Sequence, residues 1–155
     1  MFYELGMIRS RWKMALLVLL VSGIASAEKE VSSRKISVTA AGLRSDDGKV
    51  LVYLYSSKKG FPTKPAKAIR KKTGTIKDGK AYVSLTDVPH GTYAVSVIHD
   101  EDGDGKLDTN WLGIPKEGVG VSLNAKGKAG PPKYKDAKFV LDADEKKLKI
   151  TIRYL

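Results

Sequence analysis

The sequence predicts an all-β protein, a single antiparallel Greek-key β-sandwich of about seven strands preceded by a signal peptide. Short runs of β-branched and aromatic residues recur along the chain, and turn sequences lie between them. No segment of helical length keeps an apolar period of 3.6 residues. With 155 residues, 42% of them hydrophobic, and no Cys, the chain has the size of one domain that folds without disulfides.

The expected strands differ in how many faces they bury. Val50–Tyr55 is apolar on both faces, which predicts a central strand. Residues 147–154 alternate apolar and polar side chains, which predicts a half-buried strand. The remaining strands are expected around Ile36, Val38 and Ala40, within Lys67–Ile76, over Lys80–Thr86 and Thr92–His99, and around Ala137, Phe139 and Leu141.

Turn chemistry separates these runs. Asp46-Asp47-Gly48 and Lys77-Asp78-Gly79 each carry an Asp-Gly pair, which predicts a β-hairpin. Pro89-His90-Gly91 marks a third turn. Pro62–Lys72 is the best helical candidate, although it holds two prolines.

The N-terminal region has the pattern of a secretion signal. Basic residues precede the apolar run Ala15–Ala25, and Ala25-Ser26-Ala27 follows it. The run is shorter than the roughly 20 apolar residues of a membrane span, so an uncleaved anchor is the weaker interpretation. We therefore expect a signal peptide over 1–27, cleavage after Ala27, and a periplasmic or secreted domain over 28–155 without a transmembrane segment.

The formal net charge of +11 first suggests an anionic partner. Export argues against nucleic acid, and the charge is concentrated in one segment. Lys58–Lys80 contains nine basic residues and one acid. This segment is either a basic adaptor that contacts anionic envelope surfaces or a solvated sheet edge whose lysines prevent aggregation.

An Asp-rich segment has the pattern of a calcium loop, D-x-D-x-D-G-x-x-D, beginning at Asp100. Carboxylates at alternate positions can surround one hard cation, and Gly105 allows the sharp bend that turns the next carbonyl inward. Leu107 stands where such loops carry an apolar residue that pins the loop to the protein. The predicted Ca²⁺ ligands are the carboxylates of Asp100, Asp102, Asp104 and Asp108, the carbonyl of Lys106 and the carboxylate of Glu117.

The loop departs from the usual pattern at its twelfth position, where Trp111 replaces a bidentate Glu. Glu117 or Asn110 supplies the missing oxygen if the chain folds back, and an affinity of only about 10⁻⁴ to 10⁻³ M is expected. His99 is expected to brace the strand end next to the loop, with metal ligation or general-base chemistry as the alternatives. Trp111 is expected to anchor the loop in the core, and a stacking surface is the other interpretation. Gly113–Gly120 either wraps over the acidic loop or forms a ligand loop.

Several short motifs resemble those of a bacterial family known as domain of unknown function 2141. The matching elements are Gly60-Phe61-Pro62, Pro89-x-Gly91-x-Tyr93-Ala94, His99-Asp100-Glu101, Gly105-x-x-Asp108-x-Asn110, Gly113-Ile114-Pro115-x-Glu117-Gly118, Gly120-x-Ser122 and Asp136-Ala137-x-Phe139. The resemblance implies an exported β-sandwich related to prealbumin-like and carboxypeptidase-regulatory-like domains. It implies no established activity.

Catalytic motifs are absent from the sequence: it has no H-E-x-x-H, no G-x-S-x-G, no phosphate-binding loop and no Cys nucleophile. We therefore predict a non-enzymatic binding or structural module of the cell envelope, whose partner the sequence does not identify. A metal-assisted hydrolase that uses His99, Asp100 and Glu101 is the alternative. It requires an open coordination site and a concave pocket that joins His99, Asp100 and Glu117.

Overall fold

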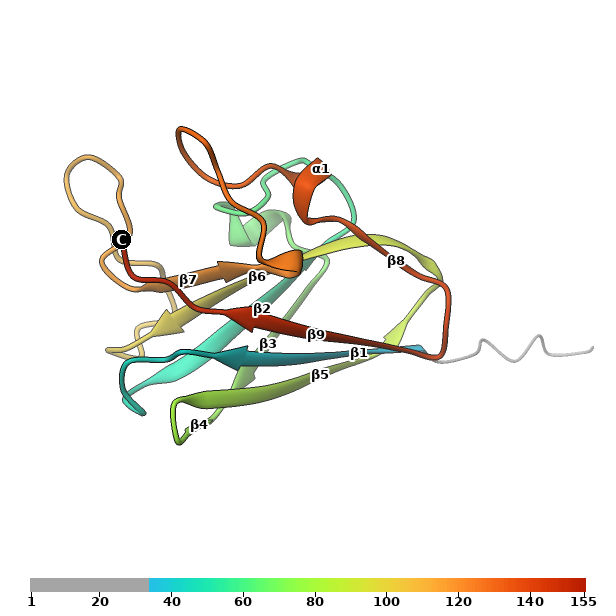
Figure 1. Ribbon diagram of the computed structural model, residues 1–155, viewed down its shortest axis with the longest axis horizontal. Helices are drawn as coiled ribbons and strands as arrows, with labels where there is room; N and C mark the ends of the chain where they lie inside the picture. The colour runs from blue at the N-terminus through green and yellow to red at the C-terminus, as the bar shows by residue number, and fades with distance from the viewer. Residues whose placement is uncertain (1–33) are drawn as a thin grey trace, which may run out of the picture. The chain divides into compact units, whose positions relative to one another are not determined.

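The computed structural model describes residues 34–155, so the predicted signal peptide and its cleavage site lie outside the described residues. Residues 34–155 form two β-sheets that pack face to face (Figure 1). The predicted all-β sandwich is therefore confirmed. Within residues 34–155, no helix is long and apolar enough to cross a membrane.

The first sheet has the strand order β4-β5-β1-β9. Its strands are β1 (Arg34–Ala41), β4 (Ile76–Lys77), β5 (Lys80–Val88) and β9 (Glu145–Thr151). β5 pairs antiparallel with β1 and β4, whereas β9 lies parallel to β1. The expectation of a purely antiparallel sandwich is wrong at this edge, because β9 reaches the first sheet by a crossover from β8 in the second.

The second sheet has the order β3-β2-β6-β7, and β8 pairs with the beginning of β6. Its strands are β2 (Lys49–Tyr55), β3 (Arg70–Gly74), β6 (Gly91–Asp100), β7 (Gly118–Val121) and β8 (Phe139–Leu141). Three single-turn helices complete the described chain: η1 (Pro65–Lys67), η2 (Ser122–Asn124) and α1 (Tyr134–Ala137). The sequence did not indicate β4, which has two residues, or β7, whose glycines have low strand propensity.

The turns give a mixed outcome. Lys77-Asp78-Gly79 forms the β4–β5 hairpin, with positive φ of 53° at Asp78 and 66° at Gly79, as a type I′ turn requires. The hairpin predicted at Asp46-Asp47-Gly48 is wrong, because this turn joins β1 of one sheet to β2 of the other. An Asp-Gly pair therefore determines the local bend of the chain, whereas packing determines which strands pair with each other.

The main core lies between the sheets, and the second sheet is also covered on its outer face. Val50, Val52 and Leu54 of β2 enter the core between the sheets. The alternate side chains of Leu51, Tyr53 and Tyr55 pack outward beneath the segments that contain Phe61 and Tyr134. The prediction that Val50–Tyr55 is buried on both faces is therefore confirmed.

Two local expectations are corrected. Ala137 belongs to α1 and not to a strand, since β8 begins only at Phe139. Pro62–Lys72 is not an α-helix, because its prolines limit it to η1 before β3 begins at Arg70. β3 is an edge strand with four exposed positions.

Candidate metal centre

The end of β6 carries two polar residues that are completely buried. His99 and Asp100 are both 0% exposed, although they follow an apolar strand. The β6–β7 register places Gly118 opposite His99, so Glu117 arrives beside the end of β6. The pairing of these two strands thus brings together residues that the sequence separates by the whole acidic loop.

One oxygen of the Asp100 carboxylate is engaged and the other is not. Oδ2 accepts a hydrogen bond of 3.0 Å from the Gly105 N–H and lies 3.4 Å from the Lys49 ammonium. Gly105 has a φ of 83°, which lets the loop turn back toward Asp100. Oδ1 is buried and has no hydrogen-bond partner within residues 34–155. A buried carboxylate oxygen without a donor is costly, and a bound cation would satisfy it.

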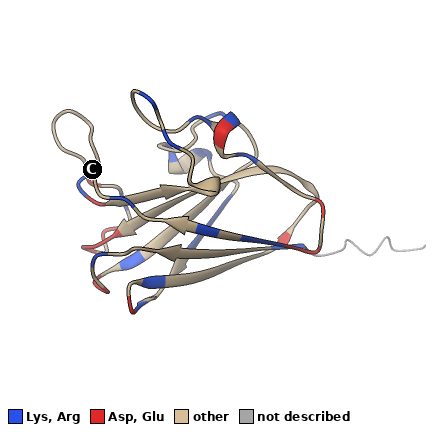
Figure 2. Cartoon of the chain, viewed as in Figure 1, with Lys and Arg blue, Asp and Glu red and all other residues tan. Residues whose placement is uncertain are grey.

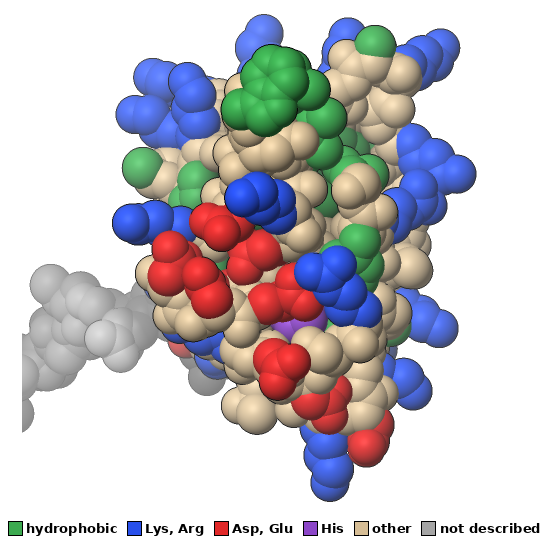
Figure 3. All heavy atoms as spheres, turned by 90° about the vertical axis from the view of Figure 1, so that its left-hand side faces the viewer, with side chains coloured by type: hydrophobic (Ala, Val, Ile, Leu, Met, Phe, Trp, Pro, Cys, Tyr) green, Lys and Arg blue, Asp and Glu red, His purple; other side chains and the backbone are tan. Residues whose placement is uncertain are grey.

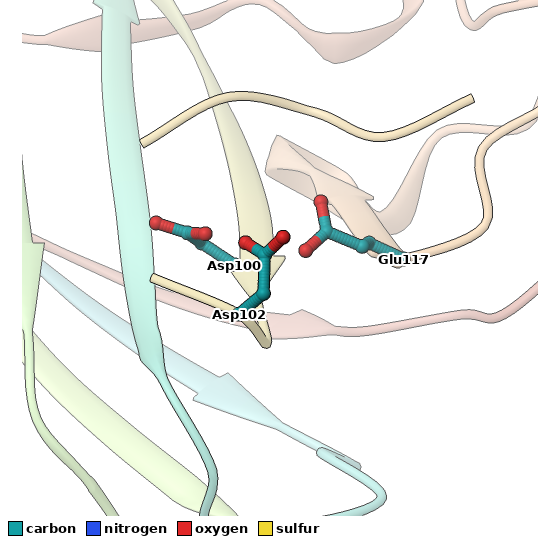
Figure 4. Close-up of side chains that lie close together, drawn as sticks. All are labelled: Asp100, Asp102 and Glu117. Carbon is teal, nitrogen blue, oxygen red and sulfur yellow. The ribbon is translucent and has the colours of Figure 1, made fainter. Parts of the chain in front are cut away.

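Asp100, Asp102 and Glu117 converge at this point (Figure 4). One oxygen from each carboxylate lies within 4.8 Å of the other two. Glu117 is 6% exposed, and its two oxygens accept hydrogen bonds from the N–H groups of Glu101 (2.9 Å) and Asp108 (3.0 Å). Glu117 therefore ties together both ends of the acidic loop while its carboxylate remains in the cluster.

The other predicted ligands lie around this group of three. Asp104 Oδ1 accepts a hydrogen bond from the Lys106 N–H at 2.7 Å, and Asp108 contributes its N–H to Glu117. Neither of their carboxylates belongs to the three-residue group found within residues 34–155. Asn110 Oδ1 instead accepts from the N–H groups of Leu112 and Ile114, so it shapes the following turn.

Leu107 performs the pinning role that the sequence suggested. It is partly buried and packs against the outer cluster of the second sheet, which contains Leu51, Tyr53, Tyr55 and Ile98. The loop therefore has one apolar anchor between its exposed carboxylates.

His99 contacts other segments of the chain through both of its ring nitrogens. Its Nε2 lies 2.9 Å from the Asp47 carbonyl, which only accepts, so Nε2 donates. Its Nδ1 lies 2.7 Å from the Tyr154 hydroxyl. Burial raises the pKa of Tyr154, so its hydroxyl stays protonated at neutral pH. Both ring nitrogens of His99 therefore have hydrogen-bond partners, which favours the bracing interpretation over general-base chemistry.

Arg44 adds a second brace beside His99. Its guanidinium forms two hydrogen bonds to the Glu101 carboxylate, of 2.8 and 2.6 Å, and lies 4.4 Å from the centre of the Tyr154 ring. This contact with Arg44 lowers the pKa of Glu101. Sequence reasoning missed Arg44, Lys49 and Tyr154, because no local motif shows that the ends of β1, β2 and β9 meet the acidic loop.

The expectation for Trp111 is wrong. Its side chain is 90% exposed, so it anchors nothing in the core. An antiparallel bridge between Thr109 and Pro115 closes a narrow turn, and this turn carries Trp111 away from the sheets. The interpretation that Gly113–Gly120 wraps back toward the acidic loop holds at Lys116, whose N–H donates to the Asp108 carbonyl.

One group of acidic side chains surrounds the loop, and other acids lie elsewhere, on α1 and in the β8–β9 connection (Figure 2). Acidic side chains gather on the face that contains the loop, whereas basic side chains spread over the strands and the other loops (Figures 2 and 3). Within Lys58–Lys80, Arg70 and Lys72 of the edge strand donate to the carbonyls of Asp87 and Ser84 on β5. These bonds favour a role at the sheet edge, and the adaptor interpretation stays a prediction.

A cavity of about 430 Å³ lies away from the acidic loop. Phe61, Pro132 and Tyr134 line it together with lysines. A hydrolase would require a pocket that joins His99, Asp100 and Glu117. None of these three residues lines this cavity.

The fold and the acidic centre together define a β-sandwich with an oxygen-rich loop at one end of the second sheet. The family model described as "Uncharacterized protein conserved in bacteria (DUF2141)" matches residues 38–149. The chain therefore belongs to this family, as its motifs predicted. Comparison with curated proteins and with solved structures found no match, so the prealbumin-like relationship stays a prediction.

Proposed function

We propose that this protein is an exported, non-enzymatic module of the cell envelope whose acidic loop binds calcium. The supporting observation is the buried Oδ1 of Asp100, which has no hydrogen-bond partner within residues 34–155. Export is inferred from the signal-peptide pattern over residues 9–27.

The donor set fits a hard cation, because all three clustered groups are carboxylates. Calcium–oxygen distances are about 2.3–2.6 Å, so ligands on opposite sides of one ion lie about 4.6–5.2 Å apart. The separation of no more than 4.8 Å among the oxygens of Asp100, Asp102 and Glu117 is compatible with one such ion. In this proposal Glu117 takes the place of the acid that the twelfth loop position lacks.

Bound calcium would relieve the repulsion among these carboxylates. In the described structure the Lys49 ammonium places one positive charge beside the cluster. It lies 3.4 Å from Asp100 Oδ2 and donates a hydrogen bond of 2.8 Å to the Gly103 carbonyl. A divalent ion would add the remaining charge and restrain the segment from Glu101 to Glu117, which then presents Gly113–Ser122 to a partner.

Calcium titration of single-carboxylate variants tests the proposal. Asp100→Asn keeps an oxygen that can accept the Gly105 N–H, and Asp102→Asn changes an exposed side chain. With a Kd of about 10⁻⁴–10⁻³ M, about 10 mM calcium should stabilise the native protein by about 1.4–2.7 kcal/mol. For the natural protein we expect a rise of several degrees in melting temperature and a calorimetric binding signal. Either substitution should weaken calcium affinity at least about tenfold and should reduce the rise in melting temperature accordingly.

Asp142→Asn is the matched control, because it removes the same charge from an exposed position between β8 and β9. It should leave the calcium response unchanged. The proposal fails if millimolar calcium produces neither heat nor a change in melting temperature, or if Asp100→Asn and Asp102→Asn respond as the control does.

A further inference from the structure

The turn that follows the acidic loop ends in three exposed apolar side chains. Trp111 is 90% exposed, Leu112 61% and Ile114 41%. We call these three residues the apolar tip. The tip belongs to the loop that projects beyond the sheets near the C-terminus (Figure 1), and exposed hydrophobic side chains lie above the acidic group in Figure 3.

We propose that the apolar tip inserts into the interfacial region of a lipid bilayer. A Trp at the head of an exposed turn is suited to this region, where the ring is partly apolar and its N–H remains hydrated. Leu112 and Ile114 add apolar area that bilayer insertion would remove from water. The tip lies on a loop that projects beyond the sheets (Figure 1), so it can enter a deformable lipid phase without a matching groove.

The tip is already ordered in the free protein. Asn110 Oδ1 accepts hydrogen bonds from the N–H groups of Leu112 and Ile114, at 2.9 and 3.0 Å. The Asn110 N–H donates to the Ile114 carbonyl, and the Gly113 N–H donates to the Asn110 carbonyl, both at 2.9 Å. Gly113 adopts a φ of 75°, which this tight turn requires. Pre-organisation reduces the conformational entropy lost on insertion.

The charges beside the tip determine which membranes it should enter. Residues 99–117 contain six acids and two lysines, Lys106 and Lys116. The carboxylates would repel anionic headgroups, whereas they oppose a zwitterionic surface much less. Calcium should therefore promote insertion into anionic membranes and matter little for zwitterionic ones. This calcium dependence rests on the proposed function, but the insertion of the tip does not.

Fluorescence of Trp111 tests the proposal directly. The chain has two Trp residues, and Trp12→Phe leaves Trp111 as the single emitter whether or not the N-terminal segment is removed. Protein recovered from cells that express the full chain, with its N-terminus read by mass spectrometry, is mixed with phosphatidylcholine vesicles or with vesicles containing phosphatidylglycerol. Each mixture is measured in calcium and in chelator, with brominated lipids as quenchers of inserted Trp.

We expect a blue shift and bromine quenching with phosphatidylcholine in both conditions, and with phosphatidylglycerol only in calcium. The double variant Leu112→Ser/Ile114→Ser should lower the apparent partition coefficient reported by Trp111 at least about tenfold. Val140→Ser is the control, because Val140 is also exposed but lies on β8, which pairs with the opposite end of β6.

The outcomes separate the two proposals. If Trp111 shows neither a blue shift nor quenching with any vesicle, the tip does not enter lipid. The proposal is then wrong, and a protein that binds the tip is the better explanation for its exposure. Shifts with both lipids that ignore calcium would support tip insertion and contradict the calcium dependence. If the double variant partitions as well as Val140→Ser, insertion by the tip is wrong.

Discussion

Tyr154 joins three parts of the molecule through one hydroxyl group. This hydroxyl lies within hydrogen-bond distance of His99 Nδ1, at 2.7 Å, and accepts a hydrogen bond of 3.0 Å from the backbone N–H of Arg44. His99 itself is completely buried, so the loss of this partner leaves a ring nitrogen without solvent to replace it. The functional end of the second sheet thus depends on a residue next to the C-terminus.

Tyr154→Phe should lower the free energy of unfolding by about 1–3 kcal/mol, since it leaves His99 Nδ1 buried and unpaired. Urea denaturation measures this change. Tyr53→Phe is the matched comparison, because the Tyr53 hydroxyl is buried without a hydrogen-bond partner within residues 34–155. Removal of that hydroxyl should be neutral or slightly stabilising. Equal destabilisation by both substitutions would contradict this account of Tyr154.

At the scale of elements, β7 contains two glycines, Gly118 and Gly120, at the positions where the end of β9 and the residue after it pack closely against it. A Cβ on Gly118 would lie 2.5 Å from Ile152 Cγ2, and one on Gly120 would lie 2.7 Å from Ile150 Cγ2. The glycines of the Gly118–Val121 segment therefore permit close packing of β7 against β9. This contact fixes the position of Glu117 directly before the strand.

Ser122, which follows β7, connects it to two other elements. The buried Ser122 Oγ accepts a hydrogen bond of 2.9 Å from the Val95 N–H of β6 and donates one of 2.7 Å to the Ala137 carbonyl of α1. The motif Gly120-x-Ser122 is thus explained by packing and backbone hydrogen bonding.

Ser122→Ala should destabilise the protein by about 1–3 kcal/mol, because a buried N–H and a buried carbonyl would each lose a partner. Chemical denaturation measures this loss. Ser57→Ala changes an exposed serine and should alter stability by less than about 0.5 kcal/mol. The structural role of Ser122 is refuted if the two variants unfold at the same urea concentration.

At the scale of the whole described molecule, one ion pair connects the two sheets at the end that carries the acidic loop. Arg44 follows β1 of the first sheet, and Glu101 follows β6 of the second. Their two hydrogen bonds lower the pKa of Glu101 in the folded state. The unfolded chain should titrate this group near the usual value of about 4.3.

The stabilisation from this pair should be complete above the unfolded pKa and should disappear as the pH falls through the lower, folded pKa. The Arg44→Gln variant should therefore be less stable than the natural protein at about pH 5, and this difference in stability should become smaller as the pH falls to about 2. The contact of Arg44 with the Tyr154 ring leaves a remainder that does not depend on pH. Melting temperatures over this pH range test the prediction, and a difference that stays constant would contradict it.

Much of the fold could be predicted from local pattern. The alternation around Leu148 and Ile150 and the double-sided burial of Val50–Tyr55 both appear in the structure. Partner choice could not be predicted in the same way, because it depends on contacts between distant segments. Asp46-Asp47-Gly48 connects two sheets, and β9 lies parallel to β1, although the local sequence of either segment is compatible with a hairpin.

The sequence by itself determined the β-sandwich class, the family motifs and the positions of the acidic residues, because periodicity, turns and spacing are local properties of the chain. Only the tertiary structure decided that Asp100, Asp102 and Glu117 converge while Asp104 and Asp108 remain outside that group. It also decided that Trp111 is exposed. The physical reason is that β6–β7 pairing, the contact with β9 and the closed turn at 109–115 are long-range or geometric effects that residue spacing does not encode.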